Sequence, residues 1–311
     1  MQTLICGSLA FDTIMVFPDR FKNHILAEKI HMLSVAFLVP EMRREWGGTA
    51  GNIAYNLKLL GGDPLIMATV GDDFGPYRDR LDQLGISRAC VREVAGTYTA
   101  QAFITTDLDD NQITAFHPGA MNFSHLNAVA DAPGAKFGVI APDGRDGMLQ
   151  HAREFAAAGI PYLFDPGQGL PMLTGQEILA FLEGARYFAV NDYEAQLLTD
   201  KTGLSLEQLA GRVEAAIVTR GAAGSSILVG GGTVHIPAVK PDAIVDPTGC
   251  GDAYRGGLLY GLSQGWSWER TGQLASLMGS VKIASRGGQN HAPDREDLSS
   301  RYRAAFGEDL F

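Results

Sequence analysis

A glycine-rich run near the end of the chain, DPTGCGDAYRGG at residues 246–257, places Asp252 directly behind Gly249, Cys250 and Gly251. A glycine-rich turn that leads into a helix directs successive backbone N–H groups into one space, and the helix N-terminus adds partial positive charge. Such a turn binds an anion, most naturally a phosphate. An aspartate at the same helix start can take the proton from a hydroxyl group that attacks phosphorus. Taken alone, the run favours a structural interpretation, in which Asp252 only caps a helix that follows a turn.

A second run, GGTAGNIAYNLKLLGGDPLIMATVGDDFG at residues 47–75, makes the chemical interpretation more specific. Paired Gly47 and Gly48 allow a ligand to approach the backbone closely. Asn52 follows at the start of a helical pattern, where its side chain either caps the helix or bonds to a ligand hydroxyl. Two glycine-rich helix starts in one chain predict a site at which phosphoryl transfer takes place.

The bulk composition excludes several classes of protein. The chain has 311 residues, 46% of them hydrophobic, and a net charge of −10. An acidic chain without a long basic run is a poor nucleic-acid binder. No apolar run is long enough for a membrane helix and the N-terminus does not resemble a signal peptide. The three cysteines are too few and too widely spaced for a disulfide framework or a zinc cluster, so we expect a soluble cytoplasmic protein without a membrane partner.

Strand and helix patterns alternate along most of the chain, which predicts an α/β fold with a mostly parallel sheet. Two β-rich segments interrupt this alternation, and the second contains a hairpin pattern around the turn DLDDNQ. We expect the two segments to pair as a small sheet over the carboxyl edge of the main sheet, where covering elements often act as lids. The expected large α/β domain comprises residues 1–12, 47–90 and 118–311, and the expected lid comprises residues 13–46 and 91–117.

Both glycine-rich runs resemble the motifs of the PfkB carbohydrate-kinase family, also called the ribokinase family. The departure is Cys250, where the family normally has alanine or another small residue, and whose backbone N–H is unchanged. The resemblance implies a ribokinase-like three-layer α/β/α sandwich with a small β-sheet lid and an ATP-dependent kinase activity. It further implies that Asp252 is the general base and that the N–H groups of Gly249, Cys250 and Gly251 form the anion hole.

The resemblance also assigns residues to the phosphate donor and its cations. Asn191 and Glu194, in VNDYEAQLL, match a motif linked to phosphate and to Mg²⁺ held through water, although their spacing is also that of a helix capping box. The run VTRGAAGSS resembles the nucleotide loop, in which we assign Thr219, Gly221 and Gly224 to ATP. Two further residues are candidates for a monovalent cation such as K⁺: Asp246 and Thr248.

The acceptor side of the expected site is less completely assigned. In the family an aspartate at the position of Asp12 binds two vicinal hydroxyls, and a carboxylate can accept both hydrogen bonds. Phe103 and Phe116, in the second β-rich segment, either flank a nucleobase or pack within the sheet. Asp165 ends a strand and matches a family acid, and Arg255 either faces the transferred phosphate or points outward.

The residues of the two motifs resemble those of the nucleoside and adenosine kinase branch of the family most closely. We therefore expect 5′-phosphorylation of a purine ribonucleoside, adenosine- or inosine-like, with broad base tolerance. The alternatives are a ribokinase- or fructokinase-like sugar kinase and, more remotely, a non-catalytic nucleoside-binding protein or a dinucleotide-binding oxidoreductase. The last would need Gly-x-Gly-x-x-Gly after the first strand, where CGSLAFD stands instead. An open edge of the lid sheet can pair with a second subunit, so the expected oligomeric state is either a monomer or a homodimer formed through the lid.

Overall fold

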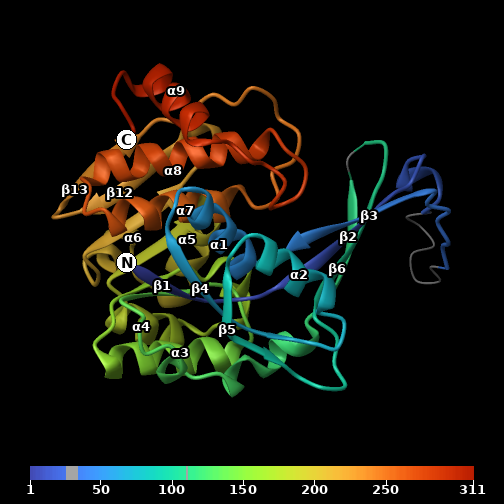
Figure 1. The fold of residues 1–311 in the computed structure, drawn as a ribbon, viewed down its shortest axis with the longest axis horizontal. Helices are drawn as coiled ribbons and strands as arrows, with labels where there is room; N and C mark the ends of the chain where they lie inside the picture. The colour runs from blue at the N-terminus through green and yellow to red at the C-terminus, as the bar shows by residue number, and fades with distance from the viewer. Residues whose placement is uncertain (26–33, 110) are drawn as a thin grey trace.

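The structure is a computed structural model that describes residues 1–25, 34–109 and 111–311. Within these residues a nine-stranded sheet forms the centre of the molecule (Figure 1). Its strands are parallel except for the last two at one edge, β12 and β13, which run antiparallel to their neighbours. In spatial order the strands are β13 (Gly232–Ile236), β12 (Ser225–Val229), β11 (Ala215–Thr219), β10 (Tyr187–Asn191), β9 (Tyr162–Phe164), β8 (Phe137–Ile140), β1 (Gln2–Cys6), β4 (Asp63–Val70) and β5 (Ser87–Glu93).

Helices cover both faces of this sheet and enclose two separate hydrophobic cores. Because side chains alternate along a strand, β1 sends Ile5 into one core and Leu4 and Cys6 into the other. The first core lies under α1 (Thr49–Leu59), α2 (Gly75–Gln83), α7 (Cys250–Ser263), α8 (Trp268–Ile283) and α9 (Arg295–Phe306), and the second under α3 (Arg145–Ala158), α4 (Gly175–Gly184), α5 (Asp192–Thr202) and α6 (Leu206–Ala210). This arrangement confirms the predicted three-layer α/β/α sandwich. No helix in the described part of the chain combines the length and hydropathy needed to cross a membrane.

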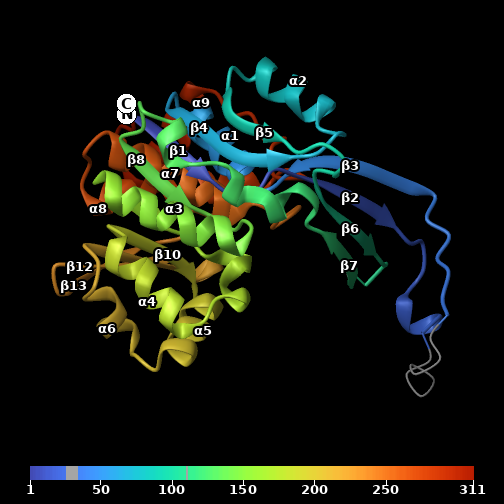
Figure 2. The ribbon, with the colours of Figure 1, turned by 90° about the horizontal axis from the view of Figure 1, so that it is seen from below.

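A separate four-stranded sheet projects from one side of the α/β body (Figure 2). Its strands, in order, are β3 (Glu41–Gly47), β2 (Ala10–Val16), β6 (Ala100–Thr106) and β7 (Gln112–His117). The predicted pairing of the two β-rich segments is confirmed, since β2 runs parallel to β6, and so is the hairpin, since β6 and β7 are antiparallel.

The strand boundaries differ by a few residues from the expected division into domains. Residues 91–93 complete β5 of the large sheet, although we expected the lid to begin at residue 91. At the other junction β2 of the small sheet already begins at Ala10, inside the segment expected to belong to the large domain. The differences arise because both strands continue in register with a neighbour past the point at which the sequence pattern changes.

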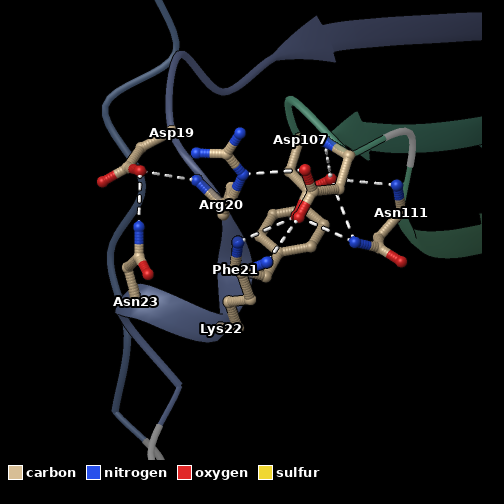
Figure 3. A network of polar contacts seen from close by, with 8 residues as sticks. Asp19, Arg20, Phe21, Lys22, Asn23, Asp107 and Asn111 are labelled. Atoms are coloured by element: carbon tan, nitrogen blue, oxygen red, sulfur yellow. Dashed lines mark hydrogen bonds and ion pairs between the residues drawn. The ribbon is translucent and has the colours of Figure 1, made fainter.

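The tip of the small sheet is fastened to the segment that follows β2 (Figure 3). The buried carboxylate of Asp107, in the hairpin turn, accepts the backbone N–H groups of Phe21, Asp109 and Asn111, each at 2.9 Å. The carboxylate of Asp109 then binds Arg20 at 2.7 Å and Lys22 at 2.8 Å. These contacts join two segments that are far apart in the sequence. The turn between β6 and β7 therefore holds the segment after β2 in place at the tip of the small sheet.

Candidate active site

The candidate site is centred on the N-terminus of α7. Gly249 precedes the helix in the left-handed region, with φ of 76°, where residues other than glycine are strained. A side chain at this position would also lie 3.2 Å from the Cα atom of Gly288. The N–H groups of Gly249 and Gly251 make no hydrogen bond within the described residues, whereas that of Cys250 donates to Pro247 O at 3.1 Å. The turn therefore presents two of the three predicted N–H groups, and the third is engaged within the loop.

The carboxylate of Asp252, in the first turn of α7, is held by the amide of Asn52. Asn52 Nδ2 donates to Asp252 Oδ2 at 2.8 Å, and Asn52 Oδ1 accepts from Gln289 Nε2 at 3.1 Å. The same nitrogen of Gln289 donates to Tyr77 Oη at 2.7 Å, and Tyr77 donates to Gly47 O at 2.8 Å. The side chain of Asn52 thus has partners within the protein, an arrangement different from the helix cap and the ligand contact considered from the sequence. It positions Asp252.

The carboxyl group of Asp252 has a pKa that is raised toward neutral pH. Burial raises the pKa of its carboxyl to about 7, against the lowering effect of the hydrogen bond from Asn52. The negative charges of Asp165 and Asp12 raise this pKa further, and the positive charge of Arg255 lowers it. A base whose pKa lies near the working pH accepts a proton most effectively while still being ionised.

Asp12 lies in β2 with its carboxylate packed against the backbone of Gly47. A side chain at residue 47 would meet Asp12 Oδ2 at 2.5 Å, so Asp12 would have to move to admit it. The next residue, Gly48, has φ of 85°, and a side chain there would meet Ser8 O at 2.5 Å. Burial, together with the negative charges of Asp246 and Glu45, raises the pKa of Asp12 to about 6. The glycine pair therefore serves the close approach of Asp12 and the turn into α1.

The two lid phenylalanines lie on opposite faces of the small sheet. Phe116 is paired with Ala102, which is paired with Asp12, so Phe116 shares the face of Asp12. Phe103 is paired with Ala115 and so lies on the other face. Both rings are exposed, at 41% for Phe103 and 52% for Phe116. Within this sheet the two rings therefore cannot form a common wall beside Asp12, and only Phe116 is on the side of the candidate site.

Arg255 and Asp165 form an ion pair below the α7 N-terminus. Arg255 Nε and Nη2 donate to the two carboxylate oxygens of Asp165 at 3.1 and 2.9 Å, and both side chains are buried. The alternatives considered for Arg255, an outward direction or a contact with phosphate, do not describe this arrangement. The pair links α7 to the segment that follows β9.

The residues expected to bind the phosphate donor lie at the ends of β10 and β11. Asn191 and Glu194 form a capping box at the start of α5, with both reciprocal hydrogen bonds at 2.8 Å. Burial raises the pKa of Glu194, as does the charge of Asp165, against the hydrogen bond from Asn191. Thr219 ends β11, the neighbour of β10.

Two glycines of the expected nucleotide loop stand in different surroundings. Gly221 has φ of 52° and open space where a side chain would extend. Gly224 has φ of 84°, and a side chain there would meet Ile236 O at 2.1 Å, so this glycine is needed for packing. Of the two, only Gly221 leaves room for a ligand beside the backbone.

Three important residues of the site carried no signal in the sequence: Tyr77, Lys282 and Gln289. Gln289 follows the pair Gly287–Gly288, and a side chain at residue 288 would meet Asn52 Oδ1 at 2.4 Å. The glycine pair is thus the one sequence feature that could have directed attention to this segment. Lys282 donates from Nζ to the backbone oxygens of Asp246 and Ser285. It lies within a helical pattern, where a lysine is ordinarily exposed.

Replacing Asn52 with alanine is expected to move the acid limb of the pH profile of kcat/KM to higher pH. The base must be ionised, so activity of the unchanged protein falls below about pH 7, the pKa of Asp252. Asn52→Ala removes the hydrogen bond that lowers this pKa, and the pKa rises further. Asp12, with a pKa of about 6, titrates below this limb.

The matched control for this measurement is Gln196→Ala. Gln196 Nε2 also donates to a carboxylate, Asp200 Oδ1, at 2.8 Å, but on an exposed helix surface. Its removal is expected to leave the profile unchanged. An acid limb at the same pH in Asn52→Ala as in the unchanged protein would contradict the role given to Asn52.

Three comparisons place this chain among known proteins. The model of the family described as pfkB family carbohydrate kinase matches residues 11–295. A nucleoside kinase of Methanothermobacter thermautotrophicus is 30% identical over 308 residues, which cover 98% of this chain and 96% of the relative. The solved structure of the nucleoside kinase of Burkholderia thailandensis in complex with inosine is 55% identical, covers 99% of each chain and superposes with a TM-score of 0.90. A second structure of that kinase, in complex with ADP-inosine, covers 99% of this chain and 97% of that chain, with a TM-score of 0.88.

Proposed function

Because this chain belongs to the pfkB family of carbohydrate kinases, whose members transfer phosphate to hydroxyl groups, we propose that it phosphorylates the 5′-hydroxyl of a purine ribonucleoside from ATP. The observation that carries the proposal is the carboxylate of Asp252, held by Asn52 beside unbonded N–H groups at the start of α7. The acceptor class is supported by the 55% identical kinase that was solved with inosine. The three cysteines are free thiols, which suits the reducing cytoplasm as the place of action.

In the proposed reaction Asp252 accepts the proton of the 5′-hydroxyl while its oxygen attacks the γ-phosphorus of ATP. The new P–O bond forms as the bond from the γ-phosphorus to the β,γ-bridging oxygen breaks, and ADP leaves. The N–H groups of Gly249 and Gly251 and the positive end of α7 stabilise the negative charge on the transferred group. Asp12 holds the ribose by accepting hydrogen bonds from its two vicinal hydroxyls.

The phosphate donor is proposed to lie along the ends of β10 and β11, beside Thr219 and Gly221. Mg²⁺ would neutralise charge on the donor phosphates, and the residues present fit a magnesium ion held mainly by phosphate and water. No three His, Cys, Asp or Glu side chains of the described residues lie close enough together to bind a metal on their own. Glu194 uses Oε2 for the backbone N–H of Asn191, which leaves Oε1 for a metal-bound water.

A panel of acceptors with ATP and Mg²⁺ tests the proposed function. Inosine and adenosine are expected to produce ADP and the nucleoside 5′-monophosphate, identified by phosphorus NMR. Ribose and fructose are expected to give no more ADP than the enzyme without an acceptor. 5′-Deoxyadenosine is the matched control, since it keeps the base and the vicinal hydroxyls but lacks the oxygen that receives the phosphate. Turnover of free sugars alone would replace the proposal with the sugar-kinase alternative.

A further inference from the structure

The side chain of Lys282, near the end of α8, is entirely buried. Its Nζ atom donates to two backbone oxygens, Asp246 O at 2.7 Å and Ser285 O at 3.1 Å. Among the described residues it makes no ion pair with a carboxylate. A buried ammonium group is costly unless other groups compensate its lost hydration. The position of Lys282 therefore calls for a role that an apolar side chain could not fill.

The two carbonyl groups belong to the two loops that build the anion site. Asp246 begins the loop that leads to Gly249 and α7, and Ser285 begins the loop that follows α8 and leads to Gln289. The same loops are joined by the carboxylate of Asp246, which accepts the N–H groups of Thr248 at 2.9 Å and Gly287 at 2.8 Å. Lys282 thus lies between the loop that leads to Asp252 and the loop whose Gln289 binds Asn52.

Burial and the nearby carboxylates act on the pKa of Lys282 in opposite directions. Burial lowers the pKa of its amine below the ordinary value of a lysine, and the carboxylates of Asp246, Asp252 and Glu45 only partly oppose this effect. The positive charge also acts on a neighbour: His291 has its pKa lowered to about 4, chiefly by burial and further by Lys282. In its protonated form the group places a positive charge beside the loop that leads to α7.

We propose that the ammonium group of Lys282 is a built-in cation that fixes the loop before α7 for phosphoryl transfer, so that this enzyme needs no monovalent cation there. Backbone oxygens are also the ligands that bind K⁺. The resemblance to the family predicted a monovalent cation at Asp246 and Thr248, but the residues present do not fit one. Lys282 already binds Asp246 O, both carboxylate oxygens of Asp246 accept N–H groups, and Thr248 is exposed. Lys282 is a positioning residue, since it touches the loop rather than the reacting atoms.

The inference rests on the proposed kinase reaction and is tested by replacing K⁺ with other cations. Activity of the unchanged enzyme is expected to be equal in potassium, sodium and choline chloride at one ionic strength. Lys282→Ala leaves the two carbonyl groups around a vacated space. In choline chloride it is expected to lose about 10- to 100-fold in kcat, the usual effect of removing a group that supports a site from behind. Potassium, ammonium or methylammonium chloride is expected to restore much of this loss.

Lys282→Met is the matched control, because it fills the space with an apolar chain of similar length and leaves no room for a cation. It is expected to lose activity as the alanine variant does, without recovery in any salt. Affinity for ADP, measured by calorimetry in the same salts, is expected to follow the same pattern. This second measurement needs no acceptor, so failure of every nucleoside to react would count against the proposed acceptor and not against the role of Lys282.

Three results would overturn the inference. The first is a clear requirement of the unchanged enzyme for K⁺. This result would contradict the proposal even if neither variant folds. The second is full activity of Lys282→Ala in choline chloride. The third is a folded Lys282→Ala protein, by circular dichroism, whose lost activity and ADP affinity no cation restores.

Discussion

Replacing Asp252 with asparagine is expected to lower kcat by about 10²- to 10⁴-fold, the range that general acid–base catalysis contributes. Asparagine has the shape of aspartate and can still accept the hydrogen bond from Asn52 Nδ2, which joins the two side chains at 2.8 Å. It cannot take the proton of the attacking hydroxyl. Binding of the nucleoside is therefore expected to persist, and the loss to appear in kcat rather than in KM.

The measurement combines steady-state kinetics with calorimetric titration of inosine into both proteins. Cys250→Ala is the control on the same turn, and its kcat is expected to change by less than about twofold, because the anion site depends on backbone geometry. Burial raises the pKa of the Cys250 thiol to about 11, so the thiol is protonated at neutral pH and offers no nucleophile. An Asp252→Asn protein that keeps most of its kcat would remove Asp252 from the role of base. A large loss in Cys250→Ala would show that the thiol itself has a part in the site.

Replacing Arg255 with methionine is expected to lower the free energy of unfolding by about 3–5 kcal/mol, the usual cost of breaking a buried ion pair from one side. The side chains of Arg255 and Asp165 are only 6% and 7% exposed, and two hydrogen bonds join them. The single replacement leaves the charge of Asp165 buried without its partner. Urea unfolding followed by circular dichroism measures the loss.

Two variants separate the cost of an unpaired charge from the loss of packing. Arg255→Met combined with Asp165→Leu removes both charges, and its stability is expected to return close to that of the unchanged protein. The exposed pair Arg186–Glu214, at 2.7 Å with 45% and 58% exposure, provides a surface comparison. Arg186→Met is expected to cost less than about 1 kcal/mol. If Arg255→Met costs no more than Arg186→Met, the buried pair is not a major support of the site.

The fold class and the place of the candidate base at a helix start were predictable from the sequence. Alternating strand and helix patterns predicted the large sheet, because each pattern reflects a local period and a buried face. The hairpin of β6 and β7 was likewise predictable from period-two alternation around a turn. Asp252 could be assigned to the first turn of α7, because the glycines that precede it specify the local backbone.

The chemical partners of these groups were decided by the tertiary structure. Asn52 and Asp252 are 200 positions apart, and their hydrogen bond forms only because α1 and α7 lie side by side in one layer. From the sequence, Arg255 was expected either to face the transferred phosphate or to point outward. In the structure it binds Asp165 instead.

Lys282 shows the same limit of sequence reasoning most clearly. A lysine in a helical pattern is predicted to be exposed. In the structure its side chain is buried, and its Nζ atom donates to carbonyl oxygens of two loops. Local sequence sets backbone conformation and the alternation of buried positions, and both are short-range properties. The partner of a polar side chain depends on which segments the packed core brings together, and that information is spread over the whole chain.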